Sequence, residues 1–367
     1  MTHYYRKKRY TKKKHLFKND KKIWIKFFFL IFLSIIFLCM QSIWKDSEEL
    51  KEYPTHKIHI AIDVDNNYIY ACIVYLTSLL NNRAKSTFYT IHVLSSDRFS
   101  KDHINKIKIV VENFGKNHSE ILFYNLGNDF AGAPVSCFAT ASYYRIALPS
   151  LLPNLDRIIY TDLDSVNLKD LTEFYNIQFQ KDMYIAAVLD RVGMLKELEV
   201  FGIKPKKYIN AGVLLMDLKT MRENSIEKKL RDFIATHDIK TVDQTAINAV
   251  CHNNIQILPY KYAVFQIYED LVEINKAQDS MYRVSESELY EAFHNTAILH
   301  FPGPNKPWNK NFQYYSRAYW WYYAKMSGFY NDILNYYRYD DKYVEDILKQ
   351  IPDDGGLLKR NYKKFKL

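Results

Sequence analysis

The sequence predicts an α/β fold in which helices cover both faces of a mainly parallel sheet. From residue 57 onward, apolar runs of strand length alternate with amphipathic stretches of helix length, which is typical of parallel strands joined by helical crossovers. With 367 residues, 48% of them hydrophobic and 25% charged, the chain has the composition of a folded protein with one large domain or two small ones.

The first predicted strand is the apolar run at 57–63, which ends in acids, and a helix-like stretch at 68–80 follows it. An apolar run of this length matches a buried strand, and the longer stretch matches a crossover helix. The same alternation predicts strands at 88–94, 121–126, 157–160, 183–189 and 212–216 and helices near 100–114 and 142–148. Residues 311–367 are expected to form a helical, aromatic appendage that ends in a basic run.

The net charge of +10 lies in the first 26 residues, which hold eleven Lys and Arg and one acid. The remaining chain is therefore neutral. A protein that grips a phosphate backbone needs a basic face on its folded part. We therefore expect no nucleic-acid partner.

An uncharged, apolar segment at 27–44 predicts one transmembrane helix before the folded part. At ~1.5 Å per residue such a helix reaches roughly 27 Å, close to the ~30 Å hydrocarbon core. Because only its N-terminal flank is basic, the positive-inside rule predicts a type II orientation. A cleaved signal peptide is the alternative, but no small-residue cleavage site follows Met40. The predicted division is a cytosolic tail at 1–26, an anchor at 27–44, a stem at 45–56, a main domain at 57–310 and the appendage at 311–367.

Cysteine and glycine patterns exclude several kinds of site. The four cysteines show no Cys-x-x-Cys spacing, so they predict neither a zinc knuckle nor a disulfide scaffold. The ten glycines include no GxGxxG and no GxxxxGK[ST] motif. Any nucleotide must be bound without a glycine-rich phosphate loop.

Two Asp-x-Asp motifs, Asp63-x-Asp65 and Asp162-x-Asp164, follow predicted strands. Ligands of α/β sheets bind beyond the carboxyl ends of strands, so both motifs are placed to reach a cleft. Two neighbouring carboxylates repel each other unless a cation lies between them. Aspartates are also common in solvated turns and helix caps, and the spacing alone favours neither interpretation.

The stretch at 143–171, YYRIALPSLLPNLDRIIYTDLDSVNLKDL, resembles the metal-binding segment of the family 8 retaining glycosyltransferases. Four further segments resemble motifs of that family in the same order, and together the similarity covers about 57–310. These segments are DNNY at 65–68, DFAG at 129–132, NAGVLL at 210–215 and HFPGPNKPW at 300–308. The resemblance implies a GT-A type, Rossmann-like fold and a UDP-sugar donor.

The resemblance also implies roles for individual residues. It places a metal ion, Mn²⁺ or Mg²⁺, on Asp162, Asp164 and His300, because oxygen ligands suit both ions and an added imidazole favours Mn²⁺. The other implied contacts are Lys306 and Gly303 at the diphosphate, Asp65 and Asn67 at the uridine, Arg145 and Asp243 at the donor sugar hydroxyls, Asn210 in the same pocket and Asp190 at either sugar.

Each of several residues also has a purely structural interpretation. His300 follows the apolar run AIL and would suit a satisfied core histidine, while Lys306 would suit a surface cation. Arg145 lies at helical spacing, where it could instead form a structural salt bridge. Asp190 fits a surface acid nearly as well as a sugar-binding residue.

For the chemical step, the family's candidate is Gln244, next to Asp243 on a helix whose Ala246 and Val250 would face the core. An amide is a poor nucleophile. We therefore expect front-face return, in which the departing phosphate oxygen takes the acceptor's proton and Gln244 supports the oxocarbenium-like centre. Many family members read Asp-Gln-Asp here, whereas this chain has Thr245, which puts a carboxylate nucleophile at that position in doubt.

The sequence therefore predicts a membrane-anchored, metal-dependent retaining transferase that moves galactose or glucose from a UDP-hexose to a glycan, glycoprotein or glycolipid. The alternatives are a UDP-xylose-using transferase and a catalytically inactive sugar-binding or scaffold protein of the same fold. The acceptor loops are expected within 260–295. A type II enzyme needs UDP-sugar on its own side of the membrane, which predicts a Golgi or endoplasmic reticulum lumen, with a bacterial inner-membrane enzyme facing the cytoplasm as the alternative.

Overall fold

The computed structural model describes residues 31–38, 40, 54–130, 132–133, 140–190, 195–204, 207–239, 241–265 and 284–350. The chain divides into two units, Met1–Tyr53 and Pro54–Leu367. The predicted tail at 1–26, most of the predicted stem and the final residues 351–367 lie outside the described part. Of the predicted anchor, residues 31–38 and 40 are described and helical. Within the described residues, no helix is both long enough and apolar enough to cross a membrane.

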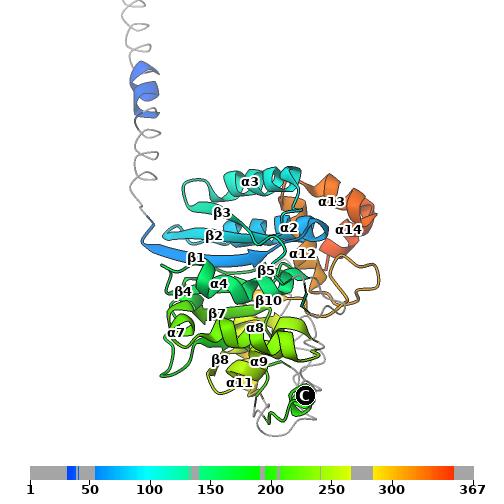
Figure 1. Ribbon diagram of the computed structural model, residues 1–367. Coiled ribbons are helices and arrows are strands. Elements are labelled where there is room, and N and C mark those ends of the chain that lie inside the picture. The colour runs from blue at the N-terminus through cyan, green and yellow to red at the C-terminus, as the bar shows by residue number, and fades with distance from the viewer. Residues whose placement is uncertain are drawn as a thin grey trace, which may run out of the picture. The chain divides into compact units, whose positions relative to one another are not determined.

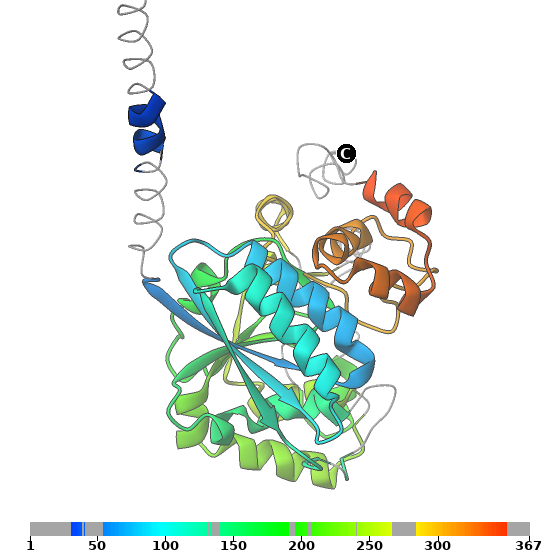
Figure 2. The same cartoon turned by 90° about the horizontal axis from the view of Figure 1, so that it is seen from above.

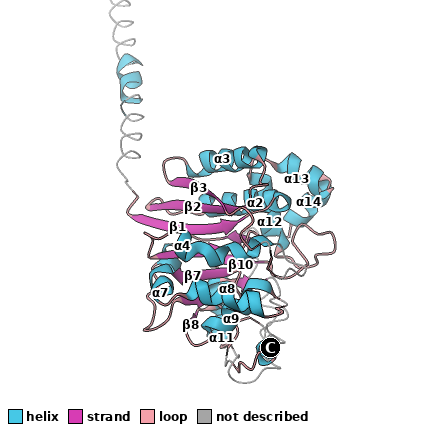
Figure 3. Cartoon of the chain, in the orientation of Figure 1, coloured by secondary structure: helices cyan, strands magenta, loops and turns pink. Residues whose placement is uncertain are grey.

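A seven-stranded sheet in the order β3-β2-β1-β4-β7-β6-β8 forms the centre of the second unit (Figures 1 and 3). Its strands are β1 (His56–Asp63), β2 (Thr87–Ser95), β3 (Ser119–Asn125), β4 (Arg157–Thr161), β6 (Ile185–Ala187), β7 (Val213–Asp217) and β8 (Ile255–Ile257). All neighbouring pairs are parallel except those of β7 with β4 and β6. The predicted mainly parallel sheet is therefore confirmed.

Helices cover both faces of this sheet, and each face has its own apolar core. Alternate residues of β1, such as Ile58 and Ile60, pack with α2 (Ile69–Asn81) and α3 (Lys101–Gly115), which lie side by side in Figure 2. The opposite core gathers the apolar sides of four helices, α4 (Leu148–Leu151), α7 (Leu218–Glu223), α8 (Ile226–Thr236) and α9 (Val242–Cys251). The period of two in the strands assigns successive side chains to opposite cores.

Two predicted elements are shorter or different in the structure. The helix expected at 142–148 is a 3-10 helix, η2 (Thr140–Ala147), followed by the single turn α4. Pro149 lies in the first turn of α4, where a missing N–H costs nothing, so the chain begins a new helix there. The strand expected at 183–189 is reduced to β6, with an isolated bridge between Leu189 and Ile209 beyond it.

A second sheet of three short strands was not predicted. It consists of β5 (Ser165–Asn167), β10 (Ile298–His300) and β9 (Val264–Phe265) in the order β5-β10-β9. β10 pairs antiparallel with β5, so that His300 lies opposite Ser165. This register brings residue 300 next to the Asp162–Asp164 segment, although more than a hundred residues separate them in the chain.

The helices after residue 310 belong to the same core as α2. They are α12 (Arg317–Met326), α13 (Tyr330–Tyr337) and α14 (Asp341–Leu348), grouped beside the α2–α3 layer in Figure 2. Trp320 and Trp321 of α12 are fully buried. The indole N–H of Trp321 donates to the Pro307 carbonyl over 3.2 Å. The segment predicted to be helical therefore contains three helices between Arg317 and Leu348.

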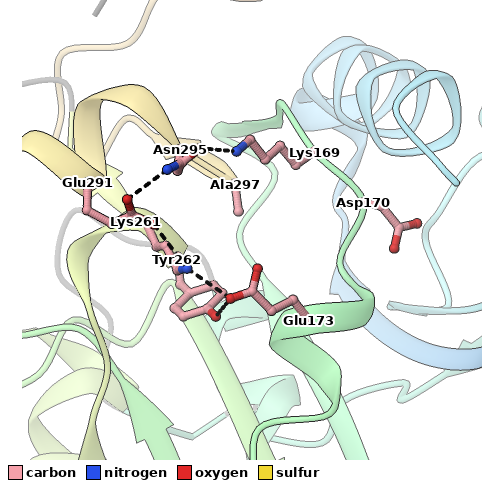
Figure 4. A pocket seen from close by; sticks show the side chains of 8 residues that line it. All are labelled: Lys169, Asp170, Glu173, Lys261, Tyr262, Glu291, Asn295 and Ala297. Atoms are coloured by element: carbon pink, nitrogen blue, oxygen red, sulfur yellow. Dashed lines mark hydrogen bonds and ion pairs between the residues drawn. The ribbon is translucent and has the colours of Figure 1, made fainter.

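An ion-pair cluster fastens the small sheet to the main body (Figure 4). Lys261 donates to Glu173 over 2.8 Å and to Glu291 over 3.4 Å, so it joins the segment before β9 to α5 (Thr172–Tyr175) and α11 (Glu286–His294). The Tyr262 hydroxyl adds a bond of 2.8 Å to Glu173. These groups line a cavity of about 240 Å³. Because its lysine and acids pair with one another, this cavity is best explained as part of the scaffold.

Two histidines form a hydrogen-bonded ladder across β1, β2 and β3. His59 Nδ1 lies 3.0 Å from His92 Nε2, and His92 Nδ1 lies 3.0 Å from the Tyr124 hydroxyl. Burial lowers the pKa of His92 to about 4, helped by the neighbouring His59. Burial and Lys57 likewise lower the pKa of His59, against a smaller opposing effect of Glu120.

This ladder predicts an acid-induced loss of stability. In the unfolded chain a histidine titrates near ~6.5, so between that pH and about 4 the unfolded state binds more protons. Stability is therefore complete above the unfolded pKa and falls by about 2–3 kcal/mol as the pH drops to 4. We expect His92→Gln to flatten this slope in urea unfolding measured between pH 4 and 7.5. His56→Gln, at the exposed end of β1, is the control; equal slopes in wild type and His92→Gln would contradict the assignment.

Candidate active site

Three side chains with metal-ligand chemistry meet between the two sheets. Asp162, Asp164 and His300 each offer a ligand atom, and these atoms lie within 4.8 Å of one another. His300 Nε2 is 3.3 Å from Asp164 Oδ1 and 3.8 Å from Asp162 Oδ2. Asp164 and His300 are buried, while Asp162 is partly exposed. The sequence-predicted trio is thus brought together, and it could hold a metal ion.

The backbone explains why these three residues meet. Asp162 follows the last residue of β4 and Asp164 precedes the first residue of β5, so the pair forms the link between the two sheets. The Asp162 amide donates to the Gly212 carbonyl over 2.7 Å, and the Phe301 amide donates to the Asp164 carbonyl over 2.8 Å. Both ends of the link are therefore fixed by hydrogen bonds.

Gly212 leaves the space that the trio occupies. A Cβ at this position would lie 2.3 Å from His300 Cε1 and 2.7 Å from Asp162 Oδ2. Real Cβ atoms essentially never approach another heavy atom this closely, so a neighbouring group would have to move. The residue must therefore be glycine for steric reasons, and its φ does not require it.

Buried polar atoms of the trio lack hydrogen-bond partners. Asp164 Oδ1 and both ring nitrogens of His300 are buried without one among the described residues. An unsatisfied buried polar atom is costly. A cation between Asp164 and His300 would satisfy an oxygen and a nitrogen together, so the donor set fits a metal ion.

Lys306 Nζ pairs with Asp164 Oδ2 and donates to the Phe301 carbonyl over 3.1 Å. Burial alone would raise the pKa of Asp164, but Lys306 and His300 outweigh it and hold this pKa well below its usual range. Asp164 is thus an anion in the folded protein. Lys306 is therefore part of the site and not a free surface cation.

Arg145 is a buried cation surrounded by acids. It contacts Asp162 over 2.8 Å and Asp243 over 3.1 Å, and Asp63 lies 4.0 Å away. Its guanidinium also donates to the Ala211 carbonyl and lies 3.9 Å from the centre of the Tyr160 ring. The predicted structural salt bridge of Arg145 is present, and its predicted contact with the donor sugar remains a prediction.

Burial raises the pKa values of Asp63 and Asp243, the two buried acids next to Arg145. It raises the pKa of Asp243 to about 7, although Arg145 opposes the shift. It also raises the pKa of Asp63 well above its usual range, with Arg145 again opposing. One guanidinium cannot neutralise three carboxylates in a buried site. The protonated forms of Asp63 and Asp243 are therefore stabilised relative to their ionised forms.

A second group joins Asp190, Asn210 and Gln244. The Gln244 side-chain N–H donates to Asp190 Oδ2 over 3.0 Å, and Asn210 donates to the same oxygen over 3.1 Å. Gln244 Oε1 accepts from the Ala211 amide over 3.0 Å. The amide of Gln244 is therefore held in one orientation, and Asp190 is a member of this network and not an isolated surface acid.

Asp65, Asn67 and Gly303 show mainly local features. Asp65 caps the short helix η1 (Asn66–Tyr68) by accepting from the Asn67 and Tyr68 amides over 2.8 and 3.0 Å. Asn67 is exposed. Gly303 has φ +84°, in the left-handed region that favours glycine. Their predicted contacts with a nucleotide remain predictions.

The sequence did not identify Glu197 as part of this region. Its carboxylate accepts from the Thr241 amide and hydroxyl over 3.2 and 3.0 Å and from the Thr245 hydroxyl over 2.6 Å. These bonds bracket the first turn of α9, where Val242 has φ +38°, a strained value for a β-branched residue. Glu197 lies on α6 (Leu195–Glu199), and no motif links it to α9.

Comparison with known proteins shows bacterial relatives. The chain is 27% identical over 290 residues to general stress protein A of Bacillus subtilis, covering 76% of this chain and 98% of the relative. It is 26% identical over 297 residues to a lipopolysaccharide 1,2-glucosyltransferase of Escherichia coli, covering 75% and 82%. The solved structure of galactosyltransferase LgtC with donor and acceptor sugar analogs superposes with TM-score 0.60 at 21% identity, covering 74% of this chain and 95% of LgtC. The structural likeness confirms the GT-A type fold.

The predicted location in a Golgi or endoplasmic reticulum lumen is wrong. Both relatives are bacterial, and bacteria have neither compartment. The prediction rested on the charge difference across residues 27–44, which orients a segment only when that segment spans a membrane.

The sequence similarity extends over the region that contains the site. The family model Glycosyl transferase family 8 matches residues 59–312, which include the small sheet, the large sheet except the start of β1, the acidic link and Lys306. Since this match covers more than half of the chain, the chain belongs to glycosyl transferase family 8 and is a glycosyltransferase.

Proposed function

We propose that the protein is a metal-dependent retaining hexosyltransferase that moves galactose or glucose from a UDP-sugar to a glycan or glycolipid acceptor. The observation that carries the proposal is the trio of Asp162, Asp164 and His300, in which Asp164 Oδ1 and both ring nitrogens of His300 are buried without hydrogen-bond partners among the described residues. The proposed catalytic domain spans 57–310, and the helices after it pack in the same apolar core.

Asp162, Asp164 and His300 would hold the ion, and two carboxylates with an imidazole favour Mn²⁺ over Mg²⁺. When bound, the metal supplies positive charge that stabilises the departing diphosphate. Lys306 already lies beside Asp164 and would donate to phosphate oxygens as a point charge. The positive φ of Gly303 lets the backbone turn close to the diphosphate.

Arg145, Asp243, Asn210 and Asp190 would bind the donor sugar. Arg145 and Asp243 are paired over 3.1 Å, and Asn210 and Asp190 over 3.1 Å, so each acid is already oriented by a partner. Asp65 and Asn67 would bind the uridine at the end of β1. Hydroxyl groups are distinguished well by sites built from fixed donors and acceptors.

Gln244 would support the anomeric centre without forming a covalent bond. Its amide is fixed between Asp190 and the Ala211 amide, and an amide is a poor nucleophile. Thr245 cannot supply a carboxylate at the next position. Front-face return then requires the departing phosphate oxygen to accept the acceptor's proton, while the fixed Gln244 dipole stabilises developing charge.

Two relatives support a hexose donor, since one is named a glucosyltransferase and the solved structure a galactosyltransferase. UDP-xylose remains an alternative donor, and an inactive sugar-binding protein of the same fold remains an alternative function. Part of the predicted acceptor loops, residues 266–283, lies outside the described residues.

The first test measures UDP release from UDP-galactose, UDP-glucose and UDP-xylose, with Mn²⁺ or with a chelator. We expect turnover of a UDP-hexose that the chelator abolishes. Asp164→Asn should lower kcat by more than about 100-fold, because even residues that only orient metal ligands contribute about 10–100-fold. Asp182→Asn, on an exposed turn, is the control. If no donor binds or turns over, the chain is not the proposed enzyme.

Gly212→Ala tests the steric basis of the site. The new methyl group would overlap His300 and Asp162, so we expect Mn²⁺ affinity to fall at least tenfold in a titration followed by electron paramagnetic resonance. Gly132→Ala is the matched control, because a Cβ there meets no atom of the described residues within 4 Å. Unchanged Mn²⁺ affinity of the Gly212→Ala variant would show that Asp162 and His300 do not bind the metal ion.

Glu197→Gln tests whether the first turn of α9 orients Gln244. Loss of the charged acceptor should weaken the hydrogen bonds to Thr241 and Thr245 and shift Gln244. Small displacements of catalytic groups cost up to about 100-fold, so kcat should fall about tenfold or more at little changed KM for the donor. Glu199→Gln, on the exposed side of α6, is the control. A loss of thermal stability with normal kcat would show that Glu197 only caps the helix.

A further inference from the structure

We propose that a second pocket, formed by the loop after β10 and the end of α13, binds a sugar unit that carries a phosphate or carboxylate group. The inference rests on the proposed transferase function, because it describes part of the acceptor. The pocket has a volume of about 480 Å³, within the range of about 300–1,000 Å³ typical of ligand sites. Its lining is Asn305, Trp308, Asn309, Lys310, Asn311, Tyr336, Tyr337 and Arg338.

The lining has the chemistry of a carbohydrate site. Trp308 is half-buried and held by Tyr337 at a centroid distance of 5.7 Å and by Trp320 at 5.2 Å, so its ring is a fixed wall. Flat aromatic walls bury the apolar faces of a ligand at a low entropic cost. The three asparagines provide both donors and acceptors for hydroxyl groups.

The charge of the pocket points to an anionic ligand. Lys310 and Arg338 are both exposed, and neither forms an ion pair with any acid of the described residues. The nearest acid along the chain, Asp340, caps α14 by accepting from the Tyr343 amide over 2.8 Å. Two cations without a carboxylate partner attract phosphate or carboxylate groups.

Arg338 also occupies an unfavourable backbone position. It ends α13 with φ +59°, the left-handed position in which helices usually have glycine. A long charged side chain kept at such a position costs stability. This strain is independent of the pocket's shape and charge, and it favours a role for the guanidinium group.

The pocket borders the proposed active site but is separate from the metal trio. Asn305 precedes Lys306, which pairs with Asp164. Tyr336 donates to the Asn67 carbonyl over 3.3 Å, so one wall rests on the segment proposed to bind uridine. A sugar unit in this pocket would therefore lie beside the segment proposed to bind uridine, as a unit of the acceptor that is distant from the transferred sugar.

The test uses the full chain and three probes: glucose 6-phosphate, glucuronate and neutral glucose. Their dissociation constants are measured by saturation-transfer NMR without any nucleotide. We expect at least one anionic sugar to bind at least tenfold tighter than glucose, with a preference that weakens at high salt. Binding of glucose 6-phosphate alone assigns the pocket to phosphate groups, and binding of glucuronate alone assigns it to carboxylates. Equal binding of all three probes would overturn the proposal.

Two variants locate this binding. Arg338→Gly removes the charge while relieving the backbone, so lost affinity cannot be attributed to unfolding. Combined with Lys310→Met it should reduce the preference at least tenfold. Lys85→Met with Lys229→Met removes two exposed cations elsewhere and should change nothing. A preference unchanged by Arg338→Gly and Lys310→Met would overturn the proposal.

UDP binding distinguishes the two proposals. In the presence of Mn²⁺, the affinity for UDP should stay unchanged in the Arg338→Gly, Lys310→Met variant. An equal loss of UDP and sugar affinity would assign the pocket to the nucleotide site and refute its role for an acceptor. Because the probes need no donor turnover, absence of transferase activity would leave this measurement independently interpretable.

Discussion

The candidate site depends on how the chain passes from the large sheet to the small one. Only Asp162, Leu163 and Asp164 lie between the end of β4 and the start of β5, and hydrogen bonds to Gly212 and Phe301 fix both ends of this link. The two carboxylates are thus forced together in a partly buried position. Because like charges repel strongly where water is scarce, the surrounding cations and the imidazole are necessary consequences of this geometry.

Arg145 and Lys306 share this electrostatic task unequally. Lys306 lowers the pKa of Asp164, whereas Arg145 is outweighed at Asp243 and Asp63 by burial and neighbouring acids. Asp164 therefore stays ionised beside the proposed metal, whereas Asp63 and Asp243 gain protons more readily. Different environments thus give similar carboxylates different protonation states, which is how enzymes commonly divide binding and proton-handling roles.

The segment around Gln244 lacks the second acid that many family members have, and Glu197 of α6 places a carboxylate nearby. Thr245 stands where many family members have an acid, and its hydroxyl donates to Glu197 of α6. A carboxylate is therefore present near the start of α9, but it comes from another element and accepts hydrogen bonds from the strained turn around Val242. Its hydrogen bonds go to Thr241 and Thr245, which flank Gln244 in the chain.

The sequence alone determined the alternating α/β pattern, because burial on both faces of parallel strands requires nearly continuous apolar runs. It also indicated Asp162, Asp164, His300 and Lys306 through ordered motifs. It could not determine the pairing of β5, β9 and β10, since strands of two or three residues carry no period. That pairing places His300 opposite Ser165, and only the tertiary structure shows it. The same holds for Glu197 and for Arg338, whose roles arise from contacts between distant segments and from a backbone angle that no local pattern encodes.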